Sequence, residues 1–364
     1  MKEIKLLKGN EAVAYAAVRS GCDGYFGYPI TPQSEILETL TELHPWNTTG
    51  MIVLQSESEV ASINMVYGGA GCGKRVMTSS SSPGISLMSE GMSYLAGAEL
   101  PCLVVNVQRG GPGLGTIQPS QSDYFQACKA PGHGDFHAIV LAPWSAQEMY
   151  DFVFDGFDLA FKYRNPALML ADGVIGQMME KVDIDAQRPR WSQEYIEQNF
   201  NQWAAYGKSP DREKNIVTSV DLTPQVLEDR NKVLQAKYKR MRDEDVRYDA
   251  IECEDADYVL VAFGCSARIC AAVVDLARED GYKVGLLRPI TLYPFPSEAL
   301  SKLAKNGAKG FMSVELNVGQ MVEDVRLAVG NELPTEFYGR CGGIVYTPGE
   351  VYEALKEKLI NKTK

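Results

Sequence analysis

Three residues with reactive side chains follow short apolar runs in this sequence. They are a hydroxyl, a carboxylate and a guanidinium: Thr31, Glu59 and Arg109. A carboxylate can hold or exchange a proton, whereas a guanidinium can bind another carboxylate through two parallel hydrogen bonds, to which a hydroxyl adds a third. In an open parallel sheet the carboxyl ends of the strands line one crevice. We therefore expect the three side chains to converge there around a small ligand that carries a carboxylate.

Each residue also has a structural explanation, which the sequence alone leaves open. Glu59 could complement the dipole of the helix that it begins. Thr31 could cap the helix that follows it, and Arg109 could form a structural ion pair. A shared functional role explains the three together better than three separate structural roles do.

The elements that would position these residues alternate between short apolar strands and helices. Residues 9–20 predict a helix capped at Asn10, and residues 51–54 predict a buried strand that leads into the helix of Glu59. Glycine or proline follows most of the expected strands. This alternation predicts an α/β fold with a parallel sheet.

With 364 residues the chain is long enough for two domains, and its composition changes where a linker would lie. A polar tract begins at Gln187, and residues 222–248 form a charged helical run. Mixed charges favour a solvated helix linking two domains, with a helix lying on a partner as the alternative. The sequence predicts two α/β domains of parallel sheets, at residues 1–187 and 253–364. A polar helical linker, residues 188–252, joins them.

Two glycine-rich clusters resemble phosphate loops without their context. Gly68–Lys74 has the GxxxxGK spacing, but Arg75 replaces the required Ser or Thr and the cluster follows a helix instead of a strand. Gly110–Gly115 is not a GxGxxG motif, and Pro112 stands where a dinucleotide loop would open its helix. We assign a nucleotide site to neither.

Charge and cysteine content exclude several classes of partner. Lys and Arg number 36 and Asp and Glu 47, a net charge of −11, which argues against nucleic acid or an anionic membrane. No apolar run approaches the length of about 18 residues that a membrane span needs. The charged N-terminal residues lack the apolar segment of a signal peptide, so we expect none. The eight cysteines form no CxxC pair and there are three histidines, so we expect no zinc or iron–sulfur site in this chain. The pattern indicates a cytoplasmic protein with reduced thiols.

Several motifs in this sequence resemble those of one enzyme family. GNEA, YPITPQSEI, QSESE, TSSSSPGISLMSEG and QRGGPG stand at residues 9–12, 28–36, 55–59, 78–91 and 108–113. Together they resemble the 2-oxoacid:ferredoxin oxidoreductases, in the alpha-type subunit that carries the pyrimidine-binding domain for thiamine diphosphate (ThDP). LLRPITLYPFP (286–296) and VELNVGQM (314–321) look like that family's transketolase-C-terminal-like domain. The resemblance covers nearly the whole chain.

The resemblance implies roles for single residues. Glu59, with Gly68 nine residues later, would face N1′ of the aminopyrimidine, so that the cofactor's 4′-nitrogen can act as a base. Thr31 and Arg109 would hold the carboxylate of a 2-oxoacid. The other cofactor-binding residues that it implies are Pro29, Ile30 and Ser81. Family members commonly carry Ser-Gly-Pro-Gly where this chain has Ser81-Ser82-Pro83-Gly84, so the contacts of this loop stay open.

The resemblance also implies partner subunits. The sequence holds no Gly-Asp-Gly motif for Mg²⁺ and diphosphate, and no ferredoxin-like cysteine run. ThDP would therefore be shared with a beta-type subunit that supplies the Mg²⁺ and diphosphate ligands. Iron–sulfur clusters would lie in partner subunits only, with gamma and ferredoxin-like subunits in the complex and ferredoxin as the electron acceptor.

The implied reaction is the CoA-dependent oxidative decarboxylation of a 2-oxoacid to acyl-CoA and CO2. Residues 109–124 look most like subunits assigned to branched-chain substrates such as 3-methyl-2-oxobutanoate, with 2-oxoglutarate or pyruvate as alternatives. A non-catalytic scaffold subunit and a transketolase-like transferase are the competing hypotheses. The presence of Thr31, Glu59 and Arg109 together favours the enzyme.

Overall fold

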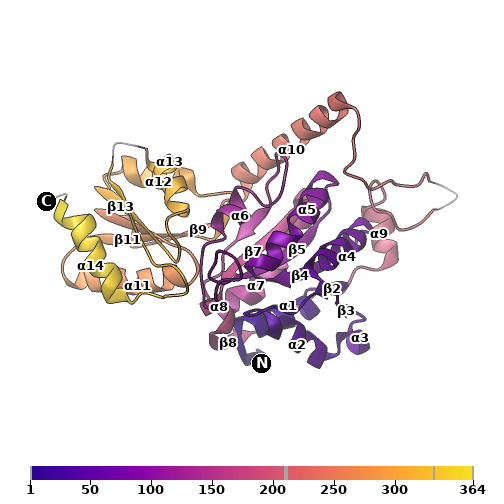
Figure 1. Ribbon diagram of the computed structural model, residues 1–364, viewed down its shortest axis with the longest axis horizontal. Helices are drawn as coiled ribbons and strands as arrows, with labels where there is room; N and C mark the ends of the chain where they lie inside the picture. Colours follow the sequence, from indigo (N-terminus) through magenta and orange to yellow (C-terminus); the bar gives the residue numbers. More distant parts are fainter. Residues whose placement is uncertain (1, 209–211, 331–332, 363–364) are drawn as a thin grey trace.

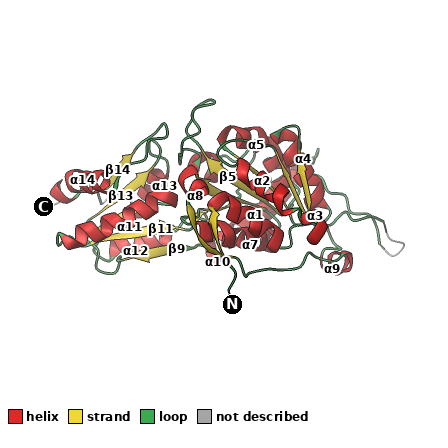
Figure 2. Cartoon of the chain, turned by 90° about the horizontal axis from the view of Figure 1, so that it is seen from below, coloured by secondary structure: helices red, strands yellow, loops and turns green. Residues whose placement is uncertain are grey.

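Two sheets of mostly parallel strands form the framework of the chain in the computed structural model, which describes residues 2–208, 212–330 and 333–362. Figures 1 and 2 show the two sheets side by side, each covered by helices. The larger sheet contains, in spatial order, β12 (Thr291–Tyr293), β6 (Ile139–Leu141), β7 (Pro166–Asp172), β5 (Cys102–Gln108), β4 (Val76–Ser80), β2 (Gly24–Gly27) and β3 (Ile52–Gln55). The smaller contains β14 (Thr335–Gly339), β13 (Gly310–Glu315), β10 (Tyr258–Val261), β11 (Val284–Pro289) and β9 (Tyr248–Ile251). The predicted α/β class is confirmed.

The helices follow the strands in the alternating order that the sequence predicts. In the larger unit they are α1 (Gly9–Arg19), α2 (Ser34–Leu43), α3 (Pro45–Thr48), α4 (Glu59–Gly71), α5 (Ser82–Gly97), α6 (Tyr124–Cys128), α7 (Ala146–Tyr163) and α8 (Gly173–Gln177). After α9 (Gln193–Asn199) and α10 (Pro224–Glu244) come α11 (Gly264–Glu279), α12 (Ser297–Lys305), α13 (Met321–Val329) and α14 (Pro348–Lys358), followed by a short 3₁₀ turn, Ile360–Lys362. In Figure 1, α12 and α13 lie on one side of the smaller sheet and α11 and α14 on the other.

Neighbouring parallel strands bring the expected functional segments to one edge of the larger sheet. Gly27 at the end of β2 pairs with Gln55 at the end of β3, and Ser80 at the end of β4 pairs with Asn106 of β5. Strands β3, β2, β4 and β5 are adjacent in that order. The segments that begin α2, α4 and α5 therefore leave the sheet on the same side.

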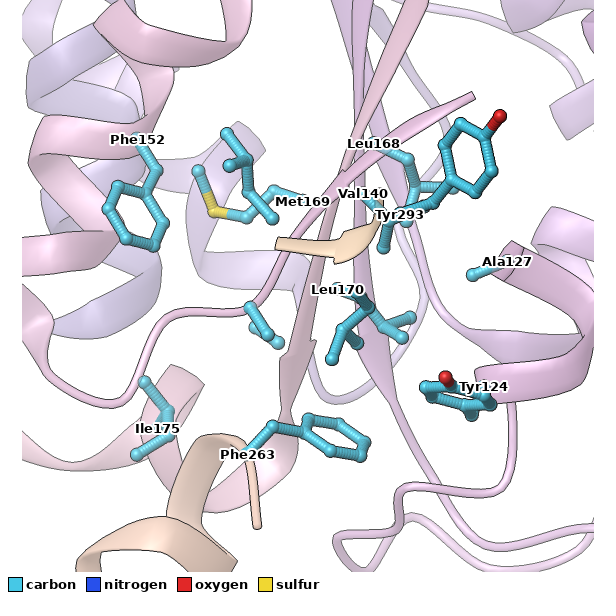
Figure 3. Close-up of a cluster of buried hydrophobic side chains, with 14 of the residues drawn as sticks. Tyr124, Ala127, Val140, Phe152, Leu168, Met169, Leu170, Ile175, Phe263 and Tyr293 are labelled. Carbon is cyan, nitrogen blue, oxygen red and sulfur yellow. The ribbon is translucent and has the colours of Figure 1, made fainter. Parts of the chain in front are cut away.

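The core of the larger sheet includes residues from the end of the chain. Strand β12 pairs antiparallel with β6, with Thr291 opposite Leu141. Figure 3 shows Tyr293 and Phe263 among the side chains around β7, and the Phe263 ring lies 6.0 Å from that of Tyr124. The two sheets thus share part of one apolar cluster. The domain boundaries at 187 and 252 stay predictions.

Two local predictions were wrong. The strand at 51–54 is not buried, because β3 is the edge of the sheet and leaves Ile52 and Leu54 55% and 41% exposed. Asn10 does not cap a helix, because α1 already begins at Gly9. Its buried amide donates to the Pro32 carbonyl at 2.7 Å.

The charged helix α10 is solvated on only part of its surface. Its face at Leu234, Tyr238 and Met241 is buried, and the Lys237 ammonium lies 3.0 Å from the Glu99 carboxylate of the larger unit. The sequence also gave no signal for the antiparallel pair of β1 (Ile4–Lys8) and β8 (Met179–Asp183). Within the described ranges, none of the helices has the length and apolar character that crossing a membrane requires.

Candidate active site

Glu59 is the first residue of α4 and points into the protein. Ser58 caps the helix, since its hydroxyl accepts a hydrogen bond from the Ala61 amide at 3.3 Å. The Glu59 side chain is only 6% exposed, whereas Glu57 is exposed. No described residue forms a hydrogen bond or ion pair with the Glu59 carboxylate. A buried carboxylate without a partner is costly, so this group is suited to a ligand.

The first turn of α5 packs directly on Glu59. A Cβ atom at Gly84 would lie 2.7 Å from Glu59 Oε1 and 2.0 Å from Ser80 Oγ, so any larger residue there would displace both side chains. Three hydroxyls at the end of β4 are buried and have no hydrogen-bond partner: those of Thr78, Ser80 and Ser81. Buried polar groups are almost always paired in proteins, so an unpaired cluster indicates a site for a bound molecule.

Of these hydroxyls, only that of Ser81 was predicted to bind the cofactor. Thr78 and Ser80 are two residues apart on one strand, so their side chains point to the same face of the sheet. Ser79 points to the other face, where its hydroxyl donates to the buried Gln33 amide oxygen at 2.6 Å. The alternation of side chains along a strand could have predicted that Thr78 and Ser80 share a face. It does not show which face meets Glu59.

Gln33 fixes the segment that holds Pro29, Ile30 and Thr31. Its side chain is fully buried and its amide nitrogen donates to the Tyr28 carbonyl at 3.1 Å. Pro29 and Thr31 are exposed and Ile30 is half-buried. Thr31 does not cap a helix, because α2 begins only at Ser34.

Arg109 lies at the end of β5 and contacts Thr31, though not through the hydroxyl. Its Nη1 donates to the Thr31 carbonyl at 3.0 Å, and Nη2 donates to the Leu114 carbonyl at 3.2 Å. The side chain is 8% exposed, and its Nε is buried without a partner. Among the described residues no carboxylate pairs with this guanidinium, so the structural ion pair is not found. A buried cation with an unpaired N–H can bind an anion.

Ser82, the first residue of α5, links Arg109 to a buried acid. Its hydroxyl lies 2.6 Å from Asp123 Oδ2 and accepts the Arg109 backbone N–H at 3.0 Å. Asn106 supports both partners, donating to Asp123 at 2.9 Å and accepting the Ser82 amide at 3.1 Å. Burial raises the pKa of Asp123, although its hydrogen bonds to Ser82 and Asn106 oppose the effect.

The structure therefore joins the predicted residues through intermediates. Arg109 touches Thr31 and Ser82, and Glu59 packs against Gly84 in the same turn of α5 as Ser82. Ser82, Asn106 and Asp123 were not predicted, because their contacts join separate strands and loops. No cluster of His, Cys, Asp or Glu suited to a metal ion occurs among the residues that the structure describes.

Comparison with known proteins agrees with this geometry. Residues 15–248 match the family "Pyruvate flavodoxin/ferredoxin oxidoreductase, thiamine diP-bdg", and residues 256–351 match "Pyruvate:ferredoxin oxidoreductase core domain II". The ketoisovalerate oxidoreductase subunit VorB of Methanothermobacter marburgensis is 49% identical, with 97% of both chains covered. The 2-oxoglutarate synthase subunit KorA of Methanocaldococcus jannaschii is 33% identical, with 97% of this chain and 99% of the relative covered.

Two solved structures share the fold. A 2-oxoglutarate:ferredoxin oxidoreductase from Magnetococcus marinus, with 2-oxoglutarate, coenzyme A and succinyl-CoA bound, aligns with a TM-score of 0.86 at 27% identity. The alignment covers 98% of this chain but 65% of that longer one. A split-gene transketolase, an inactive beta4 tetramer, aligns with a TM-score of 0.60 over 97% and 98% of the two chains, and its 13% identity supports a common fold alone. With matches of this extent along nearly its whole length, the chain belongs to the pyruvate flavodoxin/ferredoxin oxidoreductase family, with residues 15–248 forming the thiamine diphosphate-binding part.

Proposed function

We propose that this chain is the alpha-type subunit of a ThDP-dependent 2-oxoacid:ferredoxin oxidoreductase that converts a branched-chain 2-oxoacid, such as 3-methyl-2-oxobutanoate, to acyl-CoA and CO2. The observation that carries the proposal is the buried, unpaired Glu59 beside unpaired hydroxyls. The two ketoisovalerate oxidoreductase relatives, 49% and 48% identical, support the branched-chain substrate. The KorA relatives, 28% to 36% identical, keep 2-oxoglutarate as the second candidate.

The residues present fit the aminopyrimidine half of ThDP. That ring both accepts and donates hydrogen bonds, as the carboxylate of Glu59 and the hydroxyls of Thr78, Ser80 and Ser81 require. When bound, ThDP supplies the carbon nucleophile that adds to the ketone of the 2-oxoacid. Glu59 would hold a proton at N1′, in a site from which the packed turn at Gly84 keeps water away. The exposed Pro29 and half-buried Ile30 would line the same cofactor from the β2 side.

Arg109 and Thr31 would orient the substrate. Two of the five guanidinium N–H groups are held by backbone carbonyls, which leaves three for the carboxylate of the 2-oxoacid, among them the buried and unpaired Nε–H. The exposed hydroxyl of Thr31 is the proposed second contact. Leu114 and Ile117, on the loop after Arg109, are exposed and apolar. An apolar loop beside the cation suits an aliphatic side chain better than a second carboxylate.

The surface around Glu59 supports a partner subunit. The edge strand β3 exposes Ile52 and Leu54, and the neighbouring helices expose Val60, Met65 and Leu87. Open strand edges and exposed apolar side chains are typical of protein interfaces. We propose that a beta-type subunit covers this surface and supplies the Mg²⁺ and diphosphate ligands.

The remaining components of the proposed complex follow from the reaction. Oxidation of the decarboxylated substrate needs iron–sulfur clusters on partner subunits, with gamma and ferredoxin-like subunits, ferredoxin as acceptor, and CoA as the second substrate. All eight cysteines are free thiols, six of them buried. Free thiols are typical of a reducing compartment, so we place the complex in the cytoplasm.

The test is Glu59→Gln in the complex with its native partners. We expect bound ThDP to exchange its C2 proton at least about 10²-fold more slowly, with turnover falling in parallel, because Gln cannot hold the proton at N1′. Proton exchange is followed by NMR after quenching in D2O. Glu57→Gln, the same change at an exposed side chain, is the matched control and should leave both rates unchanged.

Near-normal exchange in Glu59→Gln would refute the role of this carboxylate. A wild-type complex that binds ThDP without accelerating exchange would instead favour the scaffold hypothesis. CoA-dependent viologen reduction with 3-methyl-2-oxobutanoate, 2-oxoglutarate and pyruvate decides the substrate.

A further inference from the structure

The hydroxyl of Ser82 is the only described side-chain group that holds the Arg109 backbone. It accepts the Arg109 N–H at 3.0 Å and lies 3.2 Å from the Arg109 carbonyl oxygen. The same hydroxyl lies 2.6 Å from Asp123 Oδ2. One oxygen atom in the first turn of α5 thus connects helix, strand end and buried acid.

The hydroxyl proton has a preferred direction. A hydroxyl donates one hydrogen, and the shorter contact with a carboxylate oxygen is stronger than the longer one with a neutral carbonyl. With its hydrogen on Asp123, the Ser82 oxygen keeps its lone pairs for the Arg109 N–H. Asp123 is itself fixed, because its amide donates to Gln108 Oε1 at 3.0 Å and its carboxylate accepts from Asn106.

Fixing the Arg109 backbone also fixes its side chain and the loop behind it. The guanidinium donates to carbonyls on two different segments, at Thr31 and Leu114. The loop closes on the next residue, where the Gly110 amide donates to the Gln118 carbonyl at 2.9 Å. A shift at Arg109 would therefore move the guanidinium and the apolar residues of the loop together.

We propose that Ser82 is a positioning residue for the substrate carboxylate: it holds Arg109 where its free Nε–H meets the 2-oxoacid. The proposal rests on the function proposed above for Arg109. Ser82 contacts neither Glu59 nor the unpaired hydroxyls through any described hydrogen bond. Its removal should therefore weaken substrate binding and leave proton exchange at ThDP intact.

The test compares Ser82→Ala with Ser86→Ala in the intact complex. Ser86 lies one turn later on α5 and is exposed, so Ser86→Ala removes an equivalent hydroxyl outside the site. For Ser82→Ala we expect the KM for the 2-oxoacid to rise about three- to tenfold, the loss typical of one or two hydrogen bonds. The kcat and the C2-proton exchange rate should stay within twofold. Hydrogen–deuterium exchange of residues 109–118 should become faster, and Ser86→Ala should change none of these values.

Arg109→Ala separates this inference from the function on which it rests. It should raise the same KM further than Ser82→Ala does. If Arg109→Ala raises KM and Ser82→Ala does not, the inference falls alone. It also falls if Ser82→Ala slows C2-proton exchange as much as turnover, since the site is then disturbed as a whole. If Arg109→Ala leaves KM unchanged, the proposed role of Arg109 fails and takes the inference with it. Ser82→Gly is the second variant, for the case in which Ser82→Ala does not fold.

Discussion

Glu57 and Glu59 stand two residues apart and differ in what surrounds them. Both are acidic, Glu57 just before helix α4 and Glu59 as its first residue, but only Glu59 is buried against Gly84. Glu59 and Arg109 could be proposed from the sequence, because a charged residue shortly after an apolar strand is visible within one segment. Thr78, Ser80, Ser82 and Asp123 could not be identified in the same way. Their part in the site depends on contacts between segments that the sequence does not pair.

At this scale the pH dependence of Asp123 can be predicted. Its pKa is raised by burial, so the folded chain binds the proton more tightly than the unfolded chain, and the ionised carboxylate costs stability at neutral pH. Relative to Asp123→Asn, the wild-type chain should gain stability as the pH falls from about 7 through the raised pKa towards about 4. Urea unfolding of both chains over this pH range measures the difference.

The prediction is contradicted if the difference in unfolding free energy between the wild type and Asp123→Asn stays constant as the pH falls, or if it becomes more unfavourable to the wild type. Glu57→Gln serves as the control, because it neutralises a carboxylate that is exposed in the structure. Its stability relative to wild type should vary less with pH than that of Asp123→Asn.

Among the elements, helix α4 carries the proposed catalytic residue Glu59 at its start, so we expect its cap to affect function as well as stability. Ser58 caps α4 and Ser145 caps α7 in the same way, the Ser145 hydroxyl accepting the Glu148 amide at 3.1 Å. Ser58→Ala and Ser145→Ala should each lower the free energy of unfolding by about 1 kcal/mol. Only Ser58→Ala should also reduce turnover several-fold, because Glu59 then begins a frayed turn. Chemical unfolding and steady-state assays of both variants test this, and an equal loss of turnover in both would contradict it.

Strand β3 shows the limit of prediction at the level of elements. A continuous apolar run predicts a strand buried on both faces, which is correct for β5, where every residue is buried. The same kind of pattern at β3 belongs to an edge strand with three exposed residues, two of them the apolar Ile52 and Leu54. The order of strands in a sheet is set by contacts between distant segments, so sequence periodicity cannot distinguish a central strand from an apolar edge strand.

Over the whole molecule, the two sheets are joined by a buried arginine. Arg288 of β11 is fully buried and forms ion pairs with Glu148 of α7 and Asp249 of β9, the latter at 2.9 Å. Arg288→Met should cost about 3 kcal/mol of stability, the low end for a broken buried ion pair, because both remaining carboxylates are partly exposed. Lys302→Met, which breaks an exposed pair with Glu298, should cost less than about 1 kcal/mol. Equal losses in urea unfolding would show that Arg288 does not join the sheets.

The existence of two α/β units, and of a helix between them, was predictable from alternating periodicity. The way they interlock was not. Gln121 is fully buried and bonds to Asp172 in one unit and to Phe263, Ser266 and Leu316 in the other. A polar residue in a loop gives no sign of such a role, since its partners lie 51 to 195 residues away.

Strand β12 sets an order of events during synthesis of the chain. Its partner β6 ends at Leu141, and Thr291, which pairs with that residue, is translated 150 residues later (291 − 141). At roughly 5–20 residues per second, the ribosome needs about 8–30 s to cover that interval. During this time the backbone groups of β6 that will bond to β12 stay unpaired on the nascent polypeptide, where another growing chain can reach them. Slow or crowded translation should therefore harm the yield of this protein more than that of a chain whose first sheet is complete when its first domain emerges.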